Sequence, residues 1–195
     1  MLQSSIQIEN IRKSLERYQP KTIHREDLIA AAVLIPLVQT AAGLELLFTV
    51  RTDSVEHHKG QIAFPGGARE RKDRDVYDTA LREAKEEIAL SPDQVEMIGR
   101  IDDLSTPTGF VVSPVVGYIL SLPVLQLQPE EVSAYFMAPL AFFLEAGNGY
   151  TREYQREGQS RQVWFYDYGQ YTIWGITAAI IRNFKQVLGA TPLNN

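Results

Sequence analysis

The 195-residue sequence contains no cysteine. A chain without thiols forms no disulfide and has neither a cysteine nucleophile nor a cysteine-based zinc site, so these kinds of stabilisation and catalysis are excluded. Long apolar runs are missing as well, because none approaches the roughly 20 residues that a membrane-spanning helix needs. The N-terminal residues are polar where a secretory signal peptide has its apolar region, and we therefore expect a cytoplasmic protein.

An excess of positive charge is also lacking, since 24 acidic residues outnumber 19 basic ones and the formal net charge is -5. This balance disfavours nonspecific binding to nucleic acid or to anionic membranes, and we expect neither as a partner. An anionic small molecule stays compatible with it if a metal ion supplies the positive charge. The sequence has no internal repeat, no Walker-type phosphate loop and no paired-histidine zinc motif, which removes the support for those classes of protein.

The chain does have a hydrophobic content of 45% and a length that suits one domain over residues 1–195. Strands alternate with helical segments along it, which predicts an α+β domain with a mixed sheet between helices. We expect strands at residues 30–38, 44–51, 95–101, 111–120, 132–138 and 161–166. Helices are expected at about residues 5–18, 73–90, 139–145 and 173–188. Pro36 should mark an edge or a bulge near the end of the first strand.

Three glutamates, Glu83, Glu86 and Glu87, stand at positions i, i+3 and i+4 of the second helix. Side chains with this spacing project from one face of a helix, and their like charges repel. A divalent cation relieves the repulsion, and carboxylate oxygens suit Mg²⁺ or Mn²⁺. The alternative is a solvated helix face on which Arg82, Lys85 and the glutamates form ordinary surface ion pairs. Arg82 should pair with Glu86, one turn further along.

A rigid turn with two glycines precedes this helix, in the run Phe64-Pro65-Gly66-Gly67. Residues without a Cβ let the backbone come close to a ligand and expose carbonyl and amide groups there. The combination of such a turn with an acidic helix favours a binding site over a solvated helix face. An acidic residue at Asp73 or Asp75 suits the N-terminus of the helix as a cap.

The stretch at about residues 67–90 resembles the box of the Nudix hydrolase family, a glycine and an acidic spacer followed by Arg-Glu-apolar-x-Glu-Glu-x-Gly-apolar. The second half reads Arg82-Glu83-Ala84-Lys85-Glu86-Glu87-Ile88-Ala89-Leu90 in this chain. Ala89 replaces the family's glycine. Asp73 stands where a glutamate is usual, with one extra residue before Arg82.

This resemblance implies the Nudix α/β/α sandwich and the metal-dependent hydrolysis of a phosphoanhydride. It assigns the binding of Mg²⁺ or Mn²⁺ to Glu83, Glu86 and Glu87, assisted by the carbonyl of Gly66 or Gly67. A carboxylate that is not fully committed to metal takes the proton of the attacking water, and the resemblance allows Glu86 or Glu83 in that role. Arg82 orients the carboxylate of Glu86.

Upstream of the box, the chain resembles the coenzyme A pyrophosphatases of the same family. The run Leu47-Phe48-Thr49-Val50-Arg51 follows the motif of this subgroup, as do Gly60 and residues 64–67, whereas Thr52 replaces a small residue of the motif. Residues 173–178 resemble the start of the subgroup's C-terminal helix. The resemblance implies cleavage of coenzyme A or acyl-coenzyme A to 4′-phosphopantetheine, or its acyl derivative, and adenosine 3′,5′-bisphosphate. Substrate contacts fall to Arg51, Phe64, Gly66 and Gly67.

One charge reversal keeps other functions open, because Glu56 occupies the position of the second arginine in the subgroup's motif. It favours a Nudix pyrophosphatase for another nucleoside diphosphate derivative, such as ADP-ribose or NADH, or for a nucleoside triphosphate. A noncatalytic nucleotide-binding module is a third reading. The oligomeric state, including a homodimer, stays open.

Several other polar and aromatic groups are weaker candidates for the site. They are a phosphate contact from His57 or His58, a further metal contact from Asp102 or Asp103, a base at Glu130 or Glu131, and adenine stacking by Trp164, Tyr166 or Trp174. More commonly, histidines in a polar loop are simply exposed, paired acidic residues are solvated, and aromatic residues in strands and at helix starts belong to the core. Residues 147–160 are expected to form a hairpin or loop near the mouth of the site.

Overall fold

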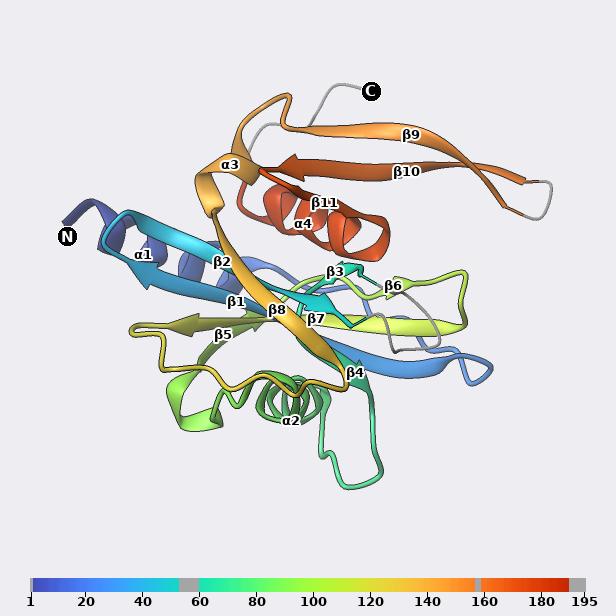
Figure 1. Ribbon diagram of the computed structural model, residues 1–195, viewed down its shortest axis with the longest axis horizontal. Coiled ribbons are helices and arrows are strands. Elements are labelled where there is room, and N and C mark those ends of the chain that lie inside the picture. Colours follow the sequence, from blue (N-terminus) through green and yellow to red (C-terminus); the bar gives the residue numbers. More distant parts are fainter. Residues whose placement is uncertain (1, 53–59, 157–158, 190–195) are drawn as a thin grey trace.

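The computed structural model describes residues 2–52, 60–156 and 159–189 (Figure 1). Glu56, His57 and His58, which the sequence singles out, lie outside these ranges. The helices are Leu2–Arg17 (α1), Val76–Ile88 (α2), Leu140–Leu144 (α3) and Gly175–Val187 (α4), with a 3-10 turn at Pro92–Gln94 (η1). Among the described residues, no helix is both long and apolar enough to cross a membrane.

The described strands form two sheets. The main sheet contains Ile29–Thr40 (β1), Gly43–Arg51 (β2), Ile62–Ala63 (β3), Gly66–Ala68 (β4), Glu96–Arg100 (β5), Leu104–Ser105 (β6), Phe110–Ile119 (β7) and Val132–Pro139 (β8). Strands β1 and β7 run parallel, whereas β1 with β2, β2 with β8 and β5 with β7 are antiparallel. The main sheet is therefore mixed, as predicted. The second sheet contains Gly149–Arg156 (β9), Gln159–Tyr168 (β10) and Tyr171–Trp174 (β11).

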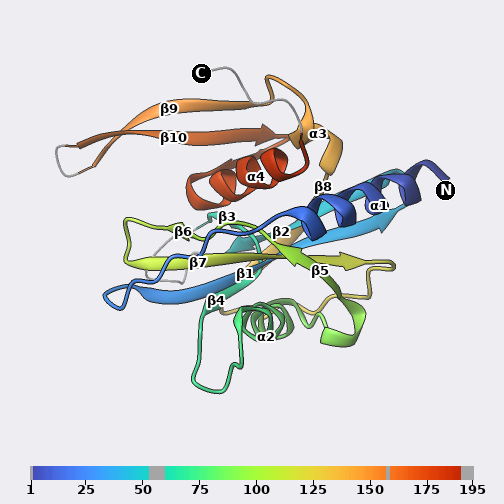
Figure 2. The same cartoon turned by 180° about the vertical axis from the view of Figure 1, so that it is seen from behind.

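Adjacent residues of the central strand β1 face opposite layers, because successive side chains of a strand alternate. Leu34 belongs to the same core cluster as Ile88 of α2. Ile35 belongs to the other cluster, which includes Leu15 of α1 and Phe184 of α4. Figures 1 and 2 show the result: α2 covers one face of the main sheet, and α1 and α4 cover the other. The predicted arrangement of a sheet between helices is confirmed.

Pro36 lies within β1, which continues to Thr40, so the predicted edge or bulge near the strand's end is wrong. On the side away from β7, β1 pairs with β4 through residues 31–33 and with β2 through residues 37–40. Pro36 falls between these two pairings, where β1 changes partner. A residue that lacks an N–H is tolerated at such a point.

The C-terminal helix begins at Gly175 rather than at Ile173. Ile173 and Trp174 belong to β11, where they pair with Tyr166 and Phe165. Gly175 has a φ of 66°, which a residue without a Cβ adopts freely, so the strand turns directly into the helix. The N-terminal helix expected at about residues 5–18 runs from Leu2 to Arg17.

The second sheet lies beyond α4, on the side away from the main sheet (Figures 1 and 2). The hairpin expected within residues 147–160 is present as β9 and the start of β10. In both views, however, α4 and the main sheet separate it from α2. The predicted location near the mouth of the acidic site is therefore wrong.

Helix α2 ends at a residue in the left-handed conformation, since Ala89 has φ 56° and ψ 28°. Its N–H donates to the carbonyl of Lys85, and the N–H of Leu90 donates to that of Ala84. A Cβ makes this conformation cost about 1–2 kcal/mol, which is why glycine is common at such helix ends. Ala89 is the one non-glycine residue with a positive φ in the described part of the chain.

We expect Ala89→Gly to raise the free energy of unfolding by about 0.5–1 kcal/mol, because the relief of strain exceeds the extra freedom that glycine gains in the unfolded chain. Urea denaturation followed by circular dichroism measures the change. Ala84→Gly, in the buried interior of the same helix, is the matched control and should lower stability. A variant at position 89 that is no more stable than the parent would contradict the expected strain.

Candidate active site

The apolar side of α2 fixes the direction in which its acidic residues point. Ala80, Ala84 and Ile88 are completely buried against the main sheet. At the N-terminus, the carboxylate of Asp75 accepts hydrogen bonds from the second and third N–H groups of the helix, both at 2.9 Å. Of the two capping positions predicted, Asp75 is the cap. The glutamates accordingly lie along the flank of the helix.

Arg82 is the centre of a network of charged side chains on this flank. Its Nη1 donates to Glu83 Oε1 at 2.8 Å and to Glu86 Oε2 at 2.9 Å, which confirms the predicted pairing with Glu86. Its Nε and Nη2 donate to the two oxygens of Asp73, each at 3.0 Å, and Nη2 also donates to the carbonyl of Ala68 at 2.9 Å. The guanidinium supplies positive charge that offsets the repulsion between the glutamates.

Asp73 anchors this network from beneath, with a side chain that is 3% exposed. Besides Arg82, it accepts hydrogen bonds from the Thr79 hydroxyl at 3.0 Å and the Glu70 N–H at 2.9 Å. Hydrogen bonding from Arg82 lowers the pKa of Asp73 to about 2, although burial acts in the opposite direction. From the sequence, Asp73 was identified only as a departure from the family's pattern and as a possible helix cap, not as the partner of Arg82. Its pairing with a residue nine positions later left no periodic signal.

Glycines 66 and 67 form the short strand β4 rather than a loop, and each is required for a different reason. A Cβ on Gly66 would lie 2.4 Å from the carbonyl oxygen of Ala32, on the paired strand β1. A Cβ on Gly67 would lie 2.6 Å from Oε1 and 2.7 Å from Oε2 of Glu83. The backbone of β4 therefore lies directly against the Glu83 carboxylate, in space that any side chain would fill.

Glu87 is the most buried of the three glutamates, with 3% exposure of the residue. Burial raises the pKa of Glu87 to about 8, and the charges of Glu83 and Glu131 act in the same direction. The charge of Arg51 and a backbone hydrogen bond from Gly66 oppose the rise in pKa. Within the described residues, neither Oε2 of Glu87 nor the buried Nε of Arg51 has a hydrogen-bond partner. Glu87 and the partly buried Arg51 thus interact electrostatically, while each keeps a buried atom without a hydrogen-bond partner.

The chemistry of this flank fits a divalent cation. Hard carboxylate oxygens are available, and the unpaired Oε2 of Glu87 is costly to bury without a partner. The missing side chain of Gly67 leaves room for the Glu83 carboxylate against the backbone of β4. As they stand, no three Asp, Glu or His side chains in the described ranges converge closely enough to hold a metal ion. Arg82 instead draws Glu83 and Glu86 to itself.

A fourth carboxylate reaches the site from the segment that precedes β8. The N–H of Gln128 donates to the carbonyl of Glu87 at 2.8 Å, and the N–H of Gln126 donates to that of Ile88 at 3.2 Å, so this segment is fixed to the end of α2. The charge of Glu131 raises the pKa of both Glu83 and Glu87, which places it within electrostatic range of them. Of the α2 glutamates, Glu86 has the most exposed side chain, at 50%.

Phe64, expected to contact the substrate, lies in the core. It is 3% exposed and its ring stacks on Phe48 with centroids 4.8 Å apart. Burial leaves the ring almost no surface for a ligand, so it positions the strand that follows. The candidates for adenine stacking lie on the second sheet, remote from α2: Tyr166 is completely buried, and the guanidinium of Arg182 lies 4.7 Å from the ring of Trp164.

Asp102 and Asp103, considered as further metal ligands, instead anchor the segment between α1 and β1. Asp102 accepts hydrogen bonds from the Tyr18 hydroxyl at 2.7 Å and the Lys21 N–H at 2.8 Å. Asp103 accepts from the Ile23 N–H at 3.0 Å and from the Ser113 hydroxyl at 2.7 Å, and it pairs with Arg100. These carboxylates are occupied by structural contacts, which overturns that expectation.

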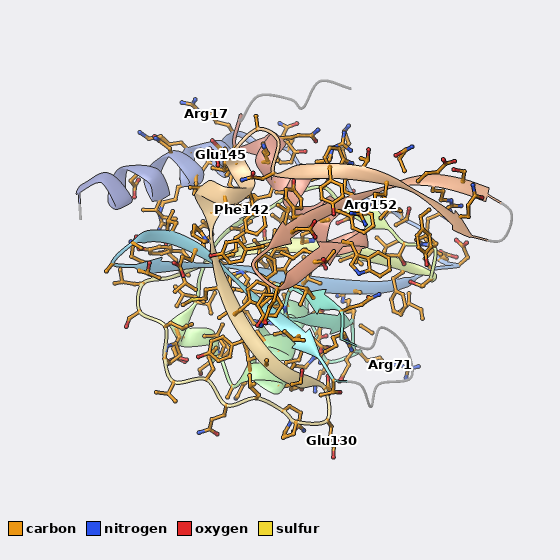
Figure 3. All side chains as sticks on the ribbon, turned by 45° about the horizontal axis from the view of Figure 1, so that its top comes forward. Arg17, Arg71, Glu130, Phe142, Glu145 and Arg152 are labelled. Carbon is orange, nitrogen blue, oxygen red and sulfur yellow. The ribbon has the colours of Figure 1, made fainter. Side chains whose placement is uncertain are left out.

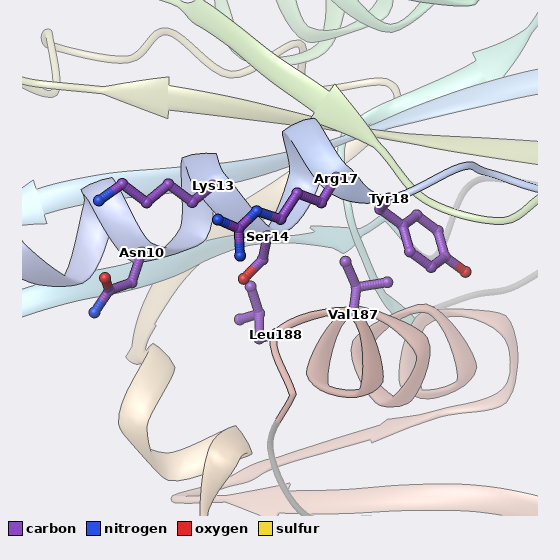
Figure 4. A pocket seen from close by; sticks show the side chains of 7 residues that line it. All are labelled: Asn10, Lys13, Ser14, Arg17, Tyr18, Val187 and Leu188. Carbon is purple, nitrogen blue, oxygen red and sulfur yellow. The ribbon is translucent and has the colours of Figure 1, made fainter.

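A cavity of about 580 Å³ lies between α1 and the C-terminal end of α4 (Figure 4). Lys13 and Arg17 line it from α1, and Val187 and Leu188 line it from the other side. It lies on the face of the main sheet opposite α2, so it contributes nothing to the acidic site.

Comparisons with known proteins agree with this architecture and with the acidic helix. Residues 28–157 match the NUDIX domain. The chain is 40% identical over 190 residues to proteins named uncharacterized Nudix hydrolase NudL from Shigella flexneri and Escherichia coli O1:K1, covering 96% of this chain and 98% of each relative.

Two solved structures share the fold. A MutT/nudix family protein from Enterococcus faecalis gives a TM-score of 0.52 at 16% identity, covering 94% of this chain and 67% of that one. The Nudix hydrolase RenU from M. smegmatis gives a TM-score of 0.50 at 18% identity, covering 58% of this chain and 72% of that one. With a domain match over most of its length and relatives at 40% identity, the chain belongs to the Nudix hydrolase family.

Proposed function

We propose that this Nudix hydrolase is a pyrophosphohydrolase, dependent on Mg²⁺ or Mn²⁺, that cleaves the phosphoanhydride bond of coenzyme A or acyl-coenzyme A. The products are 4′-phosphopantetheine, or its acyl derivative, and adenosine 3′,5′-bisphosphate. The observation that carries the proposal is the pair of buried, unpartnered atoms Glu87 Oε2 and Arg51 Nε. Glu87 offers a position for a cation and Arg51 a position for an anion, within electrostatic range of each other, and a diphosphate bound with a metal ion requires both.

The metal would be held by Glu83, Glu86 and Glu87, assisted by the carbonyl of Gly66 or Gly67. When bound, the cation supplies neutralisation of the diphosphate charge and a lowered pKa for a coordinated water. Asp73 holds Arg82 in place, and Arg82 in turn orients the carboxylates of Glu83 and Glu86 through hydrogen bonds of 2.8 and 2.9 Å. Arg51 is the donor for a phosphate oxygen, because its guanidinium is always charged.

The proton of the attacking water goes to Glu86 or to Glu83. Glu86 has the more exposed side chain, at 50% against 14%, and water reaches it more easily. Glu83 lies against the β4 backbone, and burial raises its pKa, which suits a group that must accept a proton near neutral pH. The two roles are separable by single substitutions to glutamine.

The choice of coenzyme A rests on the sequence from Leu47 to Gly67, in which Arg51 keeps the subgroup's first arginine. A second candidate, hydrolysis of ADP-ribose, NADH or a nucleoside triphosphate, is favoured by Glu56, which reverses the charge of the second arginine. A noncatalytic nucleotide-binding module is disfavoured, because a pure binder has no need of a buried carboxylate with an unsatisfied oxygen.

A substrate panel separates these functions. With Mg²⁺ or Mn²⁺ present, coenzyme A, acetyl-coenzyme A, ADP-ribose, NADH and ATP are incubated in parallel, and products are identified by mass spectrometry. We expect kcat/KM for the coenzyme A compounds to exceed the others by at least about tenfold, a difference of roughly 1.4 kcal/mol in transition-state stabilisation. A preference for ADP-ribose or NADH would show that the substrate is not coenzyme A. Tight binding without turnover would contradict an enzyme and favour the noncatalytic binding module.

Glu87→Gln should lower turnover at least about 100-fold, because a metal-directed carboxylate oxygen is replaced by an amide that binds hard cations weakly. In the absence of metal the variant should also be the more stable form. The folded-state pKa of about 8 lies above the ordinary 4.5, so ionisation of Glu87 destabilises the fold progressively as the pH rises from about 4.5 to 8.

Thermal unfolding without metal at pH 4.5 and pH 8 measures this effect, with the advantage of Glu87→Gln growing toward pH 8. Added Mg²⁺ should raise the Tm of the parent more than that of the variant. Glu16→Gln, at an exposed glutamate of α1, is the matched control for charge. Full activity in Glu87→Gln would remove the proposed metal site.

Asp73→Asn should lower the free energy of unfolding by about 2 kcal/mol at pH 7 and reduce kcat, because Arg82 loses its buried charged partner. The pKa of Asp73 is depressed to about 2, so its stabilisation is complete above the ordinary 3.8 and is lost as the pH falls through 2. The stability difference between parent and variant should therefore shrink as the pH falls from about 4 toward 2.

The matched control is Asp75→Asn, since asparagine caps a helix as well as aspartate does. That variant should keep both its stability and its kcat. Equal losses in the two variants would mean that Asp73 acts as a helix cap rather than as the anchor of Arg82.

A further inference from the structure

The three-stranded sheet presents one face to the protein and the other to solvent. Tyr166 of β10 and Ile173 of β11, paired directly opposite each other, point inward and are completely buried. Side chains of neighbouring positions point outward, because successive residues of a strand alternate. Phe165 and Trp174 are such a pair, and Tyr150 of β9 lies opposite Phe165. In Figures 1 and 2 no described helix or strand covers this outer face.

The outer face carries a continuous group of four aromatic side chains, which we call the aromatic patch: Tyr150, Tyr154, Phe165 and Trp174. Phe165 stacks between Tyr150 and Trp174 with centroids 5.7 and 6.1 Å away, and Tyr154 lies 6.0 Å from Trp174. Tyr154 is 47% exposed. The solvated face of an antiparallel sheet is normally polar, so four adjacent aromatic rings mark a surface that binds something.

Two opposite charges accompany the aromatic patch: Arg152 lies among its rings, between Tyr150 and Tyr154 on β9, and Asp167 lies beyond Phe165 on β10. The guanidinium of Arg152 lies 5.0 Å from the ring centre of Tyr150 and 5.4 Å from that of Phe165 (Figure 3). Asp167 accepts hydrogen bonds from the hydroxyls of Tyr150 at 2.6 Å and Thr172 at 2.8 Å. Neither Arg152 nor Asp167 forms an ion pair within the described residues.

The strand register makes this face complementary to itself. Arg152 is paired with Val163, two residues before Phe165, and Asp167 lies two residues after it. At about 3.3 Å per residue, the backbone positions of Arg152 and Asp167 lie about equally far from the level of Phe165 along the strands, on opposite sides of it. Two copies can be related by a two-fold axis that lies between their sheets, runs perpendicular to the strands and passes at the level of Phe165. This axis places Arg152 of one copy near Asp167 of the other. The same operation lays the aromatic patches face to face.

We propose that two copies of this chain associate through the outer faces of β9, β10 and β11, with the aromatic patches packed together and Arg152 of each copy paired with Asp167 of the other. The contact is isologous, since each surface binds itself under two-fold symmetry. Sheets pack face to face at about 10 Å, which suits interdigitated aromatic rings.

Sedimentation velocity of the full chain between about 1 and 200 µM tests the association directly. We expect a species of twice the 22.0 kDa chain mass at the higher concentrations. Tyr154→Glu should weaken the dimer at least about tenfold, because it replaces an exposed ring of the aromatic patch with a charge. Tyr135→Glu is the matched control: Tyr135 is also a partly exposed strand tyrosine, at 41%, but it lies on β8 of the main sheet, and this change should leave the dimer intact.

A mixing experiment tests the register independently of any effect on folding. Arg152→Glu and Asp167→Lys should each be monomeric alone, because each homodimer would contain two like-charged pairs. An equimolar mixture should form the heterodimer, in which the introduced glutamate of one chain faces the introduced lysine of the other and the native Arg152 and Asp167 form the second pair. Heterodimer formation also shows that both variants remain folded.

Three results would overturn the proposal. They are a parent chain that sediments as a monomer throughout the concentration range, a dimer unaffected by Tyr154→Glu, and variant chains that stay monomeric on mixing. A monomer in which Tyr154→Glu abolishes binding of a small aromatic ligand would assign the patch to that ligand instead. None of these measurements depends on turnover, so they stand or fall separately from the substrate.

Discussion

The contact between Arg82 and Asp73 is the interaction on which the acidic flank of α2 depends. Three glutamates on one side of a short helix repel one another, so a positive charge is needed to hold them together. Arg82 binds two of them and is in turn held by a carboxylate that is almost completely buried. Because Asp73 also accepts bonds from Thr79 and from the Glu70 backbone, its position is fixed on three sides. The orientation of Glu83 and Glu86 therefore derives from the turn before the helix as much as from the helix.

Glu87 differs from Asp73, because its carboxylate is buried while one of its oxygens has no hydrogen-bond partner among the described residues. Its environment raises the pKa to about 8, mainly through burial, although the charge of Arg51 acts in the opposite direction. A protein selected for stability alone would replace such a group with an amide or an apolar residue. Its retention beside the unpartnered Nε of Arg51 is understandable if both atoms are completed by a ligand. The same two unsatisfied atoms then account both for the energetic cost of the site without ligand and for the proposed chemistry.

The sequence was sufficient for those features that follow from short-range periodicity. Apolar spacing gave α2 and its buried stripe, and the spacing of Arg82 and Glu86 predicted their ion pair, which is present at 2.9 Å. Alternation and turn residues identified the longer strands and the mixed sheet between helices. What periodicity could not supply is pairing between distant segments. Pro36 suggested an edge or a bulge because the sequence does not show that β1 changes partner there, from β4 to β2.

The same limit explains the other departures. Gly66 and Gly67 were expected in a loop, but their missing side chains allow β4 to lie between β1 and Glu83. Ile173 and Trp174 fit the apolar period of the following helix, yet pairing with β10 holds them in a strand. Phe64 was expected at the substrate because it belongs to the motif shared with the coenzyme A subgroup, whereas its ring packs on Phe48 in the core. In each case tertiary contact overrode a correct local pattern.

The two faces of the molecule separate the chemistry from the proposed association. The acidic flank of α2 lies on one side of the main sheet, and β9, β10 and β11 lie beyond α4 on the other (Figures 1 and 2). Two copies joined through their outer sheets would hold their α2 helices at the far ends of the assembly, both open to solvent. Association therefore need not change access to either site, and its effect on activity would have to pass through α4. One hydrogen bond connects α4 to the strands near the acidic site: the Thr177 hydroxyl donates to the carbonyl of Ile62 on β3 at 3.1 Å. Ile62 is paired with Val50 of β2, the neighbour of Arg51.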